Sequence, residues 1–467
     1  MNEPVTFALY FGNRGFFPES LIAAARVEME QALRQAGYGV LMMPADATPH
    51  GAVETAEEGR KYAAFLAAHA GAYDGVILCL PNFGDETGAI AALRDAGVPI
   101  LVQAYPDELD KMGFANRRDA YCGKLSILDV FGQYGLAYTI LPPHTVHPLD
   151  ARFASHLDIF ARTCRVVRDM RQMVVGAFGA RTTPFKTVRF DELALQRCGV
   201  TTETFDLSEV LARARELTIS GEPCREKARR LKAYTRWDAV PAEAFEQHVR
   251  LSVVLDTMAA EARLDALALR CWIELEKEMG ISPCVVLGEL NDRGMPAACE
   301  LDVCNAVAMR ALVSASGTPA TCLDWNNNYG EDGDKVILFH CGPVPQSLMI
   351  DAGEVIDHPM FAKALGAGHG FGCNVGRIRP TPMTYASART DQGRLSFFLG
   401  QGQFTADPIP AEFFGCAGVA HIADLQRKLT GMARKGYRHH VSVCAGHVAA
   451  ALGEAFGQYL PYDVDAI

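Results

Sequence analysis

Residues 5–15, VTFALYFGNRG, decide the fold of this chain. Residues 5–11 form a short, almost unbroken apolar run, which is typical of a strand buried on both faces. Gly12-Asn13-Arg14-Gly15 predicts a turn, and residues 19–36 then carry apolar side chains at helical spacing. A strand that leads through a glycine turn into a helix is the repeating unit of a parallel α/β sheet.

The same alternation continues along the chain. It predicts strands over 39–43, 75–80 and 99–104 and helices over 53–69 and 86–95. A second α/β unit begins near Arg171, with strands over 172–178 and 202–206, a long helical region over 241–279, a strand over 284–288 and a helix from about Val303. Beyond Ser316, short β-rich runs separated by glycine and proline predict an antiparallel barrel or sandwich, closed by a helix over 446–458.

Composition limits the classes of function. The chain has 467 residues and a formal net charge of −11, and it shows no broad basic patch, so we expect no nucleic-acid partner. No apolar run approaches the roughly 18–20 residues of a membrane-spanning helix, and the N-terminus lacks a signal-peptide pattern. The fourteen cysteines include no Cys-x-x-Cys, so free buried thiols in a reducing cytoplasm are the better interpretation.

Three polar side chains suggest a metal site. Glu300 lies in Pro296–Val303 (PAACELDV), Asp324 precedes three asparagines in what we expect to be a polar loop, and His440 begins an apolar run. Carboxylates and imidazole suit Mn²⁺ or a similar hard divalent cation. Taken singly, each residue has a structural explanation about as good, namely a helix cap, a turn aspartate and a core histidine. Because all three side chains are expected at the ends of helices or strands, a shared metal site is favoured over three separate structural roles.

The loops after the first strands carry further candidates. Ligands of open α/β sheets bind at the carboxyl ends of the strands, where Arg14 and residues 82–86 (NFGDE) are expected to lie. Asp85 and Glu86 are explained as acids at a helix start. Arg14 has no such explanation. Dinucleotide, P-loop and Gly-x-Ser-x-Gly motifs are absent from the sequence, which disfavours those enzyme classes.

These motifs, in their order along the chain, resemble the L-fucose isomerase and L-arabinose isomerase superfamily, most closely its fucose-isomerase-like branch. The resemblance covers nearly the whole chain and is carried by Gly12-x-Arg14, Pro18–Leu21, Asn82–Glu86, Arg118–Lys124, His144–Pro148, Phe185–Arg189, Ala298–Val303, Asp324-x-Asn326-Asn327, His440 and Gly446–Val448. It implies two Rossmann-like, doubly wound α/β domains and a C-terminal β-barrel domain. We expect these domains at residues 1–168, 169–317 and 318–467.

The resemblance also implies a site and a set of partners. The metal ligands would be Glu300, Asp324 and His440, with His340 a further candidate for a metal or substrate contact. Glu300 and Asp324 would also be the catalytic carboxylates, and Arg14, Phe83 and Asn326 would bind substrate. The cofactor would be Mn²⁺ or another divalent cation such as Mg²⁺ or Co²⁺. The chain would assemble as a trimer or hexamer with active sites between subunits.

The reaction so implied is aldose–ketose isomerisation of a monosaccharide through a cis-enediol. The residues leave two alternatives open: an epimerase or lyase with the same enediolate chemistry, and a non-catalytic sugar-binding protein. The identity of the sugar is open as well. Arg377, Arg379 and Arg389 could serve a phosphorylated or sulfonated sugar, although surface salt bridges are the simpler explanation for each.

Overall fold

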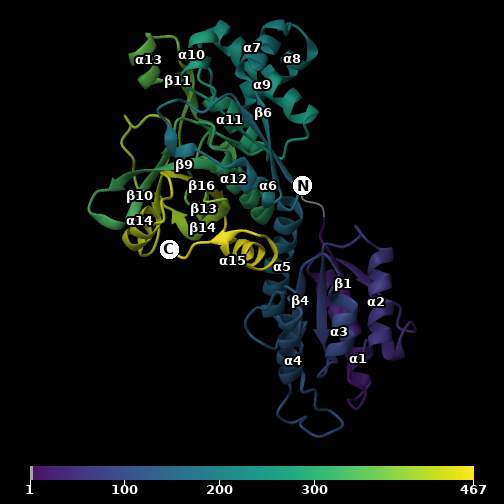
Figure 1. Ribbon diagram of the computed structural model, residues 1–467. Helices are drawn as coiled ribbons and strands as arrows, with labels where there is room; N and C mark the ends of the chain where they lie inside the picture. The colour runs from purple at the N-terminus through teal and green to yellow at the C-terminus, as the bar shows by residue number, and fades with distance from the viewer. Residues whose placement is uncertain (1–3) are drawn as a thin grey trace. The chain divides into compact units, whose positions relative to one another are not determined.

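A computed structural model describes residues 4–467, which divide into two compact units. The first unit comprises residues 4–168 and 454–460, and the second comprises residues 169–453 and 461–467. Figure 1 shows a sheet flanked by helices in the first unit, while the second unit holds a further parallel sheet and the strands of a barrel.

The first unit is built on a parallel sheet with the strand order β2-β1-β3-β4. Its elements are β1 (Thr6–Phe11), α1 (Ser20–Gln35), β2 (Gly39–Met42), α2 (Ala56–Ala68), β3 (Gly75–Leu80), α3 (Glu86–Leu93), β4 (Ile100–Ala104), α4 (Ala120–Gln133) and α5 (Ala151–Met170). Strands β3 and β4 are buried throughout, because separate apolar clusters cover the two faces of the sheet. The alternation predicted for this unit is confirmed.

The loops after β1 and β3 lie together at the point where the strand order reverses, which is where open α/β sheets bind ligands. Asn82 Nδ2 donates a hydrogen bond to Asn13 Oδ1 at 2.8 Å, and Arg14 Nε donates to the carbonyl oxygen of Gly84 at 3.0 Å. Asp85 caps α3 by accepting from the N–H groups of Thr87 and Gly88, which confirms its predicted capping role.

The second unit contains a parallel sheet with the order β6-β5-β7-β8. The elements are β5 (Met173–Phe178), α6 (Glu192–Arg197), β6 (Val200–Phe205), α7 (Leu207–Glu216), α8 (Glu222–Tyr234), α9 (Ala242–Glu261), β7 (Ala266–Leu269), α10 (Glu274–Glu278), α11 (Cys284–Asp292), β8 (Ala297–Ala298) and α12 (Val303–Ser316). Helix α12 begins where the sequence predicts it. It follows β8 closely, so Glu300 lies in the short connection between them.

Two predictions for this unit are wrong. Residues 284–288 belong to helix α11 and not to a strand. The sequence could not distinguish the two forms, because a short apolar run that is buried on all sides has the same composition in either. The region 241–279 is not purely helical, since it contains β7, whose four residues are all buried. Its ALAL sequence lacks the β-branched side chains that mark most strands.

The rest of the second unit is a closed antiparallel barrel. Its elements are β9 (Ala320–Tyr329), β10 (Asp332–His340), β11 (Glu354–Asp357), α13 (Pro359–Leu365), β12 (Phe371–Arg377), β13 (Thr381–Asp391), β14 (Arg394–Phe404), β15 (Cys416–His421), α14 (Leu425–Arg434), β16 (His440–Ala445), α15 (Ala449–Glu454) and β17 (Asp463–Val464). The strand order is β11-β12-β15-β10-β9-β16-β13-β14-β17, and pairing of β14 with β15 closes the barrel. The prediction of α/β sheets followed by a β-rich barrel is confirmed at this level.

Strand β9 corrects the prediction for Asp324. The residue lies within a continuous ten-residue strand, not in a polar loop. Its partners in register are His440 on β16 and Phe339 on β10. The barrel hydrogen bonds therefore place two of the predicted ligands, Asp324 and His440, opposite each other on neighbouring strands.

Gly123 of α4 sets the position of the loop after β3. A Cβ atom at Gly123 would lie 1.9 Å from the carbonyl oxygen of Phe83. We expect Gly123→Ala to shift this loop and to destabilise the protein by about 1–3 kcal/mol. Gly132→Ala on the same helix is the control, since no atom lies within 4 Å of its added Cβ and alanine favours a helix. Calorimetric melting should show a lower midpoint for Gly123→Ala alone; equal midpoints would contradict the packing described.

Candidate functional site

Glu300 is held in place by two hydrogen bonds to its carboxylate. His440 Nε2 lies 2.8 Å from Glu300 Oε2, and Trp272 Nε1 donates to Glu300 Oε1 at 2.9 Å. Glu300 and Leu301 have φ values of 58° and 60°, a left-handed conformation that is uncommon for residues other than glycine. Such strain is found where the surrounding structure over-determines the conformation, often at functional sites.

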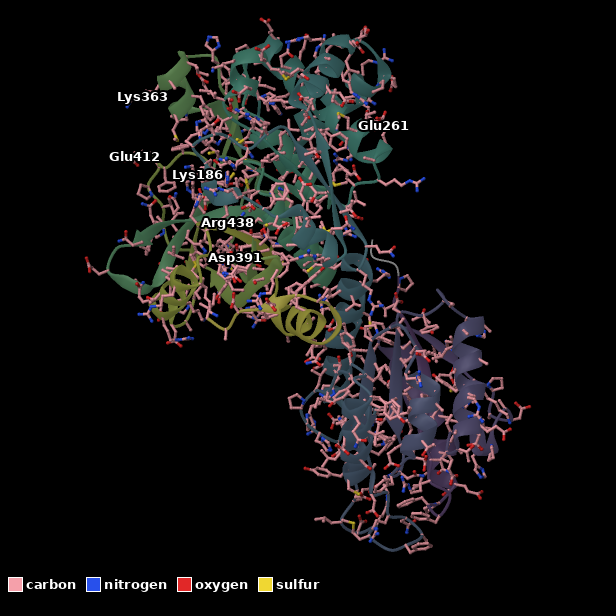
Figure 2. All side chains as sticks on the ribbon, in the orientation of Figure 1. Lys186, Glu261, Lys363, Asp391, Glu412 and Arg438 are labelled. Carbon is pink, nitrogen blue, oxygen red and sulfur yellow. The ribbon has the colours of Figure 1, made fainter. Side chains whose placement is uncertain are left out.

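His440 is fully buried and is contacted at both ring nitrogens. Its Nδ1 lies 2.8 Å from Asp302 Oδ2, while its Nε2 lies 2.8 Å from Glu300 and 3.5 Å from Asp324 Oδ1. Asp302 is itself fixed by the Arg438 guanidinium at 2.5 Å and by the backbone N–H of Asn305. Figure 2 marks Arg438 near the centre of the second unit. A carboxylate behind a histidine is the arrangement that orients metal-binding imidazoles.

Two buried polar atoms in this cluster have no hydrogen-bond partner among the described residues. They are Asp324 Oδ1 and His340 Nε2. His340 ends β10 and is 3% exposed, and its Nδ1 accepts from the backbone N–H of Cys341. Glu300, His340 and His440 form one group of donor atoms close enough to hold an ion, and Asp324, His439 and His440 form another. Buried polar groups without hydrogen bonds demand an explanation, and a cation held by these donors would supply one.

The electrostatics of the cluster favour positive charge. Burial by itself raises the pKa of Glu300, but the hydrogen bond and charge of His440 and the charge of His340 outweigh it and lower the pKa to about 2. Burial by itself lowers the pKa of His440, yet hydrogen bonds to Asp302 and Glu300 raise it to about 10. Burial opposes protonation of His340 too, but a hydrogen bond with the Cys341 side chain and the charges of Asp324 and Glu300 raise its pKa to about 9.

A cavity of about 310 Å³ opens beside Glu300 and His340, within the size range of ligand pockets. It lies in the second unit and is lined mainly by aromatic, methionine and cysteine side chains. The lining residues are Phe185, Cys271, Trp272, Glu276, Cys284, Cys299, Glu300, His340, Cys341, His358, Met360 and Phe361. All fourteen cysteines are free, as the sequence predicts. A small organic molecule in the cavity would touch Glu300 and His340.

The predicted substrate-binding residues lie elsewhere. Asn326 is exposed on β9 at an irregularity in the pairing with β10, and it does not line the cavity. Arg14 and Phe83 belong to the first unit, where the Arg14 guanidinium lies 4.4 Å from the centre of the Phe83 ring. Arg14 also forms an ion pair with Glu86 at 2.6 Å. The structure thus places Arg14 and Phe83 beside each other in the first unit, and neither of them lines the cavity of the second unit.

The three barrel arginines considered for an anionic sugar have other partners. Arg377 donates to the carbonyl oxygens of Gly376, Pro410 and Phe413. Arg379 donates to the carbonyl oxygen of Ser347, and Arg389 pairs with Asp391. None of them lines the cavity described above.

Sequence reasoning missed Asp302, Arg438, Trp272 and His439. His439 Nε2 lies 3.6 Å from Asp324 Oδ1, so it joins the cluster from the residue before His440. A signal was available for two of them: Asp302 lies two residues after Glu300, and Arg438 directly precedes the two histidines. Acids and arginines close to apolar strands are buried only when paired, so these two could have been matched to each other.

A parallel α/β framework followed by a closed barrel, with carboxylates and imidazoles gathered beside a cavity, defines a candidate metal-dependent enzyme. Comparison with protein families is more specific. Residues 8–171 match the model of the fucose/sulfoquinovose isomerase N-terminal domain, and residues 338–467 match that of the L-fucose isomerase C-terminal domain. The chain belongs to the fucose isomerase-like family, whose members are aldose–ketose sugar isomerases.

Several relatives are sulfoquinovose isomerases. That of Alkalicoccus urumqiensis is 25% identical over 355 residues, which cover 75% of this chain and 76% of the relative. That of Clostridium sp. (strain MSTE9) is 27% identical over 294 residues, 62% of this chain and 64% of the relative. That of Priestia aryabhattai is 24% identical over 295 residues, with the same shares of the two chains. In the described part of the chain, no helix has the length and apolar character needed to span a bilayer.

Asp302→Asn tests the orientation of His440. Cation binding requires an unprotonated Nε2, and the pKa values of His440 and His340 lie near 10 and 9, so Mn²⁺ affinity in the wild type should rise with pH between 6 and 8. We expect Asp302→Asn to weaken Mn²⁺ binding by about 10–100-fold. Calorimetric titration measures both effects. Asp332→Asn, an exposed acid on β10, is the control, and equal affinities for the two variants would contradict the orienting role.

Proposed function

We propose that this protein is a divalent-cation-dependent isomerase that interconverts an aldose and a ketose through a cis-enediol. One observation carries the proposal: Glu300, Asp324 and His440 converge beside a cavity, and the buried Asp324 Oδ1 forms no hydrogen bond among the described residues. Membership of a family of sugar isomerases supports the same reaction.

The donor set fits a hard or borderline divalent cation. Glu300, Asp324 and His440 would hold it, with His340 as a further ligand, and Mn²⁺ is the ion we propose, with Mg²⁺ or Co²⁺ as substitutes. A bound cation supplies Lewis-acid stabilisation of the negative charge that develops on O1 and O2 of the sugar. Asp302 keeps Nε2 of His440 directed at this position, and Trp272 keeps the Glu300 carboxylate in place.

The two carboxylates would move the protons. Isomerisation removes the C2 proton of the aldose, returns a proton to C1 and transfers the hydroxyl proton from O2 to O1. Glu300 lines the cavity, whereas Asp324 does not, so we assign the carbon-bound proton to Glu300 and the hydroxyl proton to Asp324. Phe185 and Trp272, whose ring centroids are 5.8 Å apart, give the cavity an apolar wall on which the carbon skeleton can rest.

The relatives named above indicate the substrate class. They act on sulfoquinovose, a sugar that carries a sulfonate, and we propose an anionic monosaccharide for this chain too. No lysine or arginine lines the cavity among the described residues, so the cation that pairs with the anionic group would come from elsewhere. Arg14 of another copy of the chain, with Phe83 beside it, is our candidate.

We propose that Arg14 and Phe83 act in the site of another copy of the chain, in a trimer or hexamer. The supporting observation is an exposed apolar segment after β4, where Leu109 is 90% exposed and Phe114 is 81% exposed. Arg118 ties this segment to the loop after β3, because its guanidinium donates to the carbonyl oxygen of Pro81. Exposed apolar side chains of this kind mark interaction surfaces.

Three finer features complete the proposal. The two parallel sheets would be Rossmann-like domains, with the order β2-β1-β3-β4 in the first. The second α/β domain would extend over 169–317 and the barrel domain over 318–467. The absence of disulfides among fourteen cysteines supports a reducing compartment such as the cytoplasm.

The reaction can be followed by NMR in D₂O. With Mn²⁺ present, sulfoquinovose or an uncharged aldose should give the ketose with deuterium incorporated from solvent. Glu300→Gln should lower kcat/KM by at least about 10³-fold, since it removes both a ligand and the proposed base. Exchange at C2 without ketose would indicate an epimerase instead. A fully active Glu300→Gln variant would contradict the assignment, and tight sugar binding with no exchange for any sugar would favour a non-catalytic binding protein.

Sharing of sites between subunits is tested by mixing two inactive variants. Arg14→Ala and Glu300→Gln should each be weakly active alone, since one lacks the proposed cation and the other the proposed base. Subunits exchanged between them should recover activity, because some sites then combine an intact Arg14 with an intact Glu300 from different copies. A mixture of Glu300→Gln and Asp324→Asn variants is the control. Both residues belong to the second unit of the same chain, so exchanging subunits cannot restore a complete site. Absence of recovery would contradict the shared site.

A further inference from the structure

Glu276 is a buried acid in the cavity wall that the proposed chemistry does not use. It lies on α10, is 0% exposed and lines the same cavity as Glu300. Ser282 Oγ donates a hydrogen bond to its Oε1 at 3.1 Å. Its other oxygen, Oε2, is buried and has no partner among the described residues. The carboxyl group is therefore half satisfied, and its free oxygen belongs to a cavity-lining side chain.

The surroundings of Glu276 keep its carboxyl group neutral. The titratable groups around it are Glu274 on the same helix, Cys271 after β7, Cys284 on α11 and, around the cavity, Cys299, Glu300, His340, Cys341 and His358. No lysine or arginine lines the described cavity. Burial raises the pKa of Glu276 to about 8. The raised pKa favours the protonated acid at neutral pH, and because Ser282 donates to Oε1, Oε2 is the oxygen free to carry that proton toward a ligand.

We propose that Glu276 is a substrate-binding residue that donates a hydrogen bond from Oε2 to a hydroxyl group of the sugar in the cavity. A buried hydrogen-bond donor without a partner destabilises the protein, and a sugar hydroxyl in this cavity would remove that cost. The neighbouring thiols are weak hydrogen-bonding groups, so Glu276 and His358 are the strong polar groups of the cavity wall beyond Glu300 and His340.

The assignment names the chemistry of one end of the substrate. A neutral acid can donate a hydrogen bond to an uncharged hydroxyl, whereas a sulfonate or phosphate would find no lysine or arginine to pair with at this wall. The end of the sugar in this cavity is then a hydroxyl-bearing one, and an anionic group would project out of the cavity. This inference rests on the proposed function only in that the cavity holds the sugar.

Binding of a sugar alcohol tests the inference without turnover. The Mn²⁺-loaded protein is titrated calorimetrically with the alditol of its best substrate, between pH 6.5 and 9.5. Wild-type affinity should fall above about pH 8, since ionisation of Glu276 removes the donor. Glu276→Gln keeps an N–H donor and cannot ionise, so this fall should disappear. Glu276→Leu, which has no donor, should bind about 10-fold more weakly or worse at pH 7, and in the reaction its loss should fall mainly on KM.

Glu274→Gln is the matched control. Glu274 lies on the same helix but pairs with Arg270 and does not line the cavity, so this variant should keep the wild-type dependence on pH. Two results would overturn the inference: a Glu276→Gln variant whose affinity still falls above pH 8, or a Glu276→Leu variant that is folded and binds the alditol as the wild type does. If Glu276→Leu fails to fold, the near-isosteric Glu276→Gln profile decides. If the protein isomerised none of the sugars tested, the binding test of Glu276 could still be carried out, because it measures affinity and not turnover.

Discussion

The contact of His440 with both Asp302 and Glu300 is the interaction on which the rest of the site depends. It joins the connection between β8 and α12 to strand β16 of the barrel; His440 and Asp302 are fully buried, and Glu300 is partly buried. Arg438, two residues before β16 begins, forms an ion pair with Asp302, so the buried carboxylate has a cationic partner. Removing one partner of such a buried network is costly, because the remaining charge is left uncompensated.

The same network explains why the site is prepared for a cation. Glu300, Asp302 and Asp324 bring three carboxylates close to His440, and Arg438 neutralises only Asp302 directly. Asp324 Oδ1 has only longer contacts to His440 and His439, and neither it nor His340 Nε2 forms a hydrogen bond in the described chain; such a buried group costs about 1–3 kcal/mol. Two strained residues, Glu300 and Leu301, hold the geometry in advance of binding. The cavity beside them is apolar except at a few positions, as in most small-molecule sites.

Much of this architecture could be predicted from the sequence. Uninterrupted apolar runs such as residues 75–80 and the helical spacing of 20–35 identify the first sheet, because buried parallel strands and amphipathic helices have different periodicities. The β-rich texture of the last third predicts the barrel. Residues 266–269 and 284–288 are assigned to the wrong form by the sequence, since a short apolar run is equally compatible with a buried helix and a buried strand.

Prediction of the site was limited for a different reason. Glu300, Asp324 and His440 could be proposed from donor chemistry and family resemblance, and the structure does bring them together. Asp302 and Arg438 act through a pairing between residues far apart in the sequence, so their positions beside Glu300 and His440 mark them as candidates but do not by themselves show the contact. Glu276 is distinguished only by its burial in the cavity wall, which no pattern of residues around it reveals.

The position of the cation is the most direct test of this account. Anomalous diffraction from crystals grown with Mn²⁺ would locate the ion independently of any assay. The account predicts one peak bounded by Glu300, Asp324 and the Nε2 of His440, with Asp302 still in contact with Nδ1. A peak elsewhere, or an empty site in which His440 Nε2 remains hydrogen-bonded to Glu300 at saturating Mn²⁺, would contradict it.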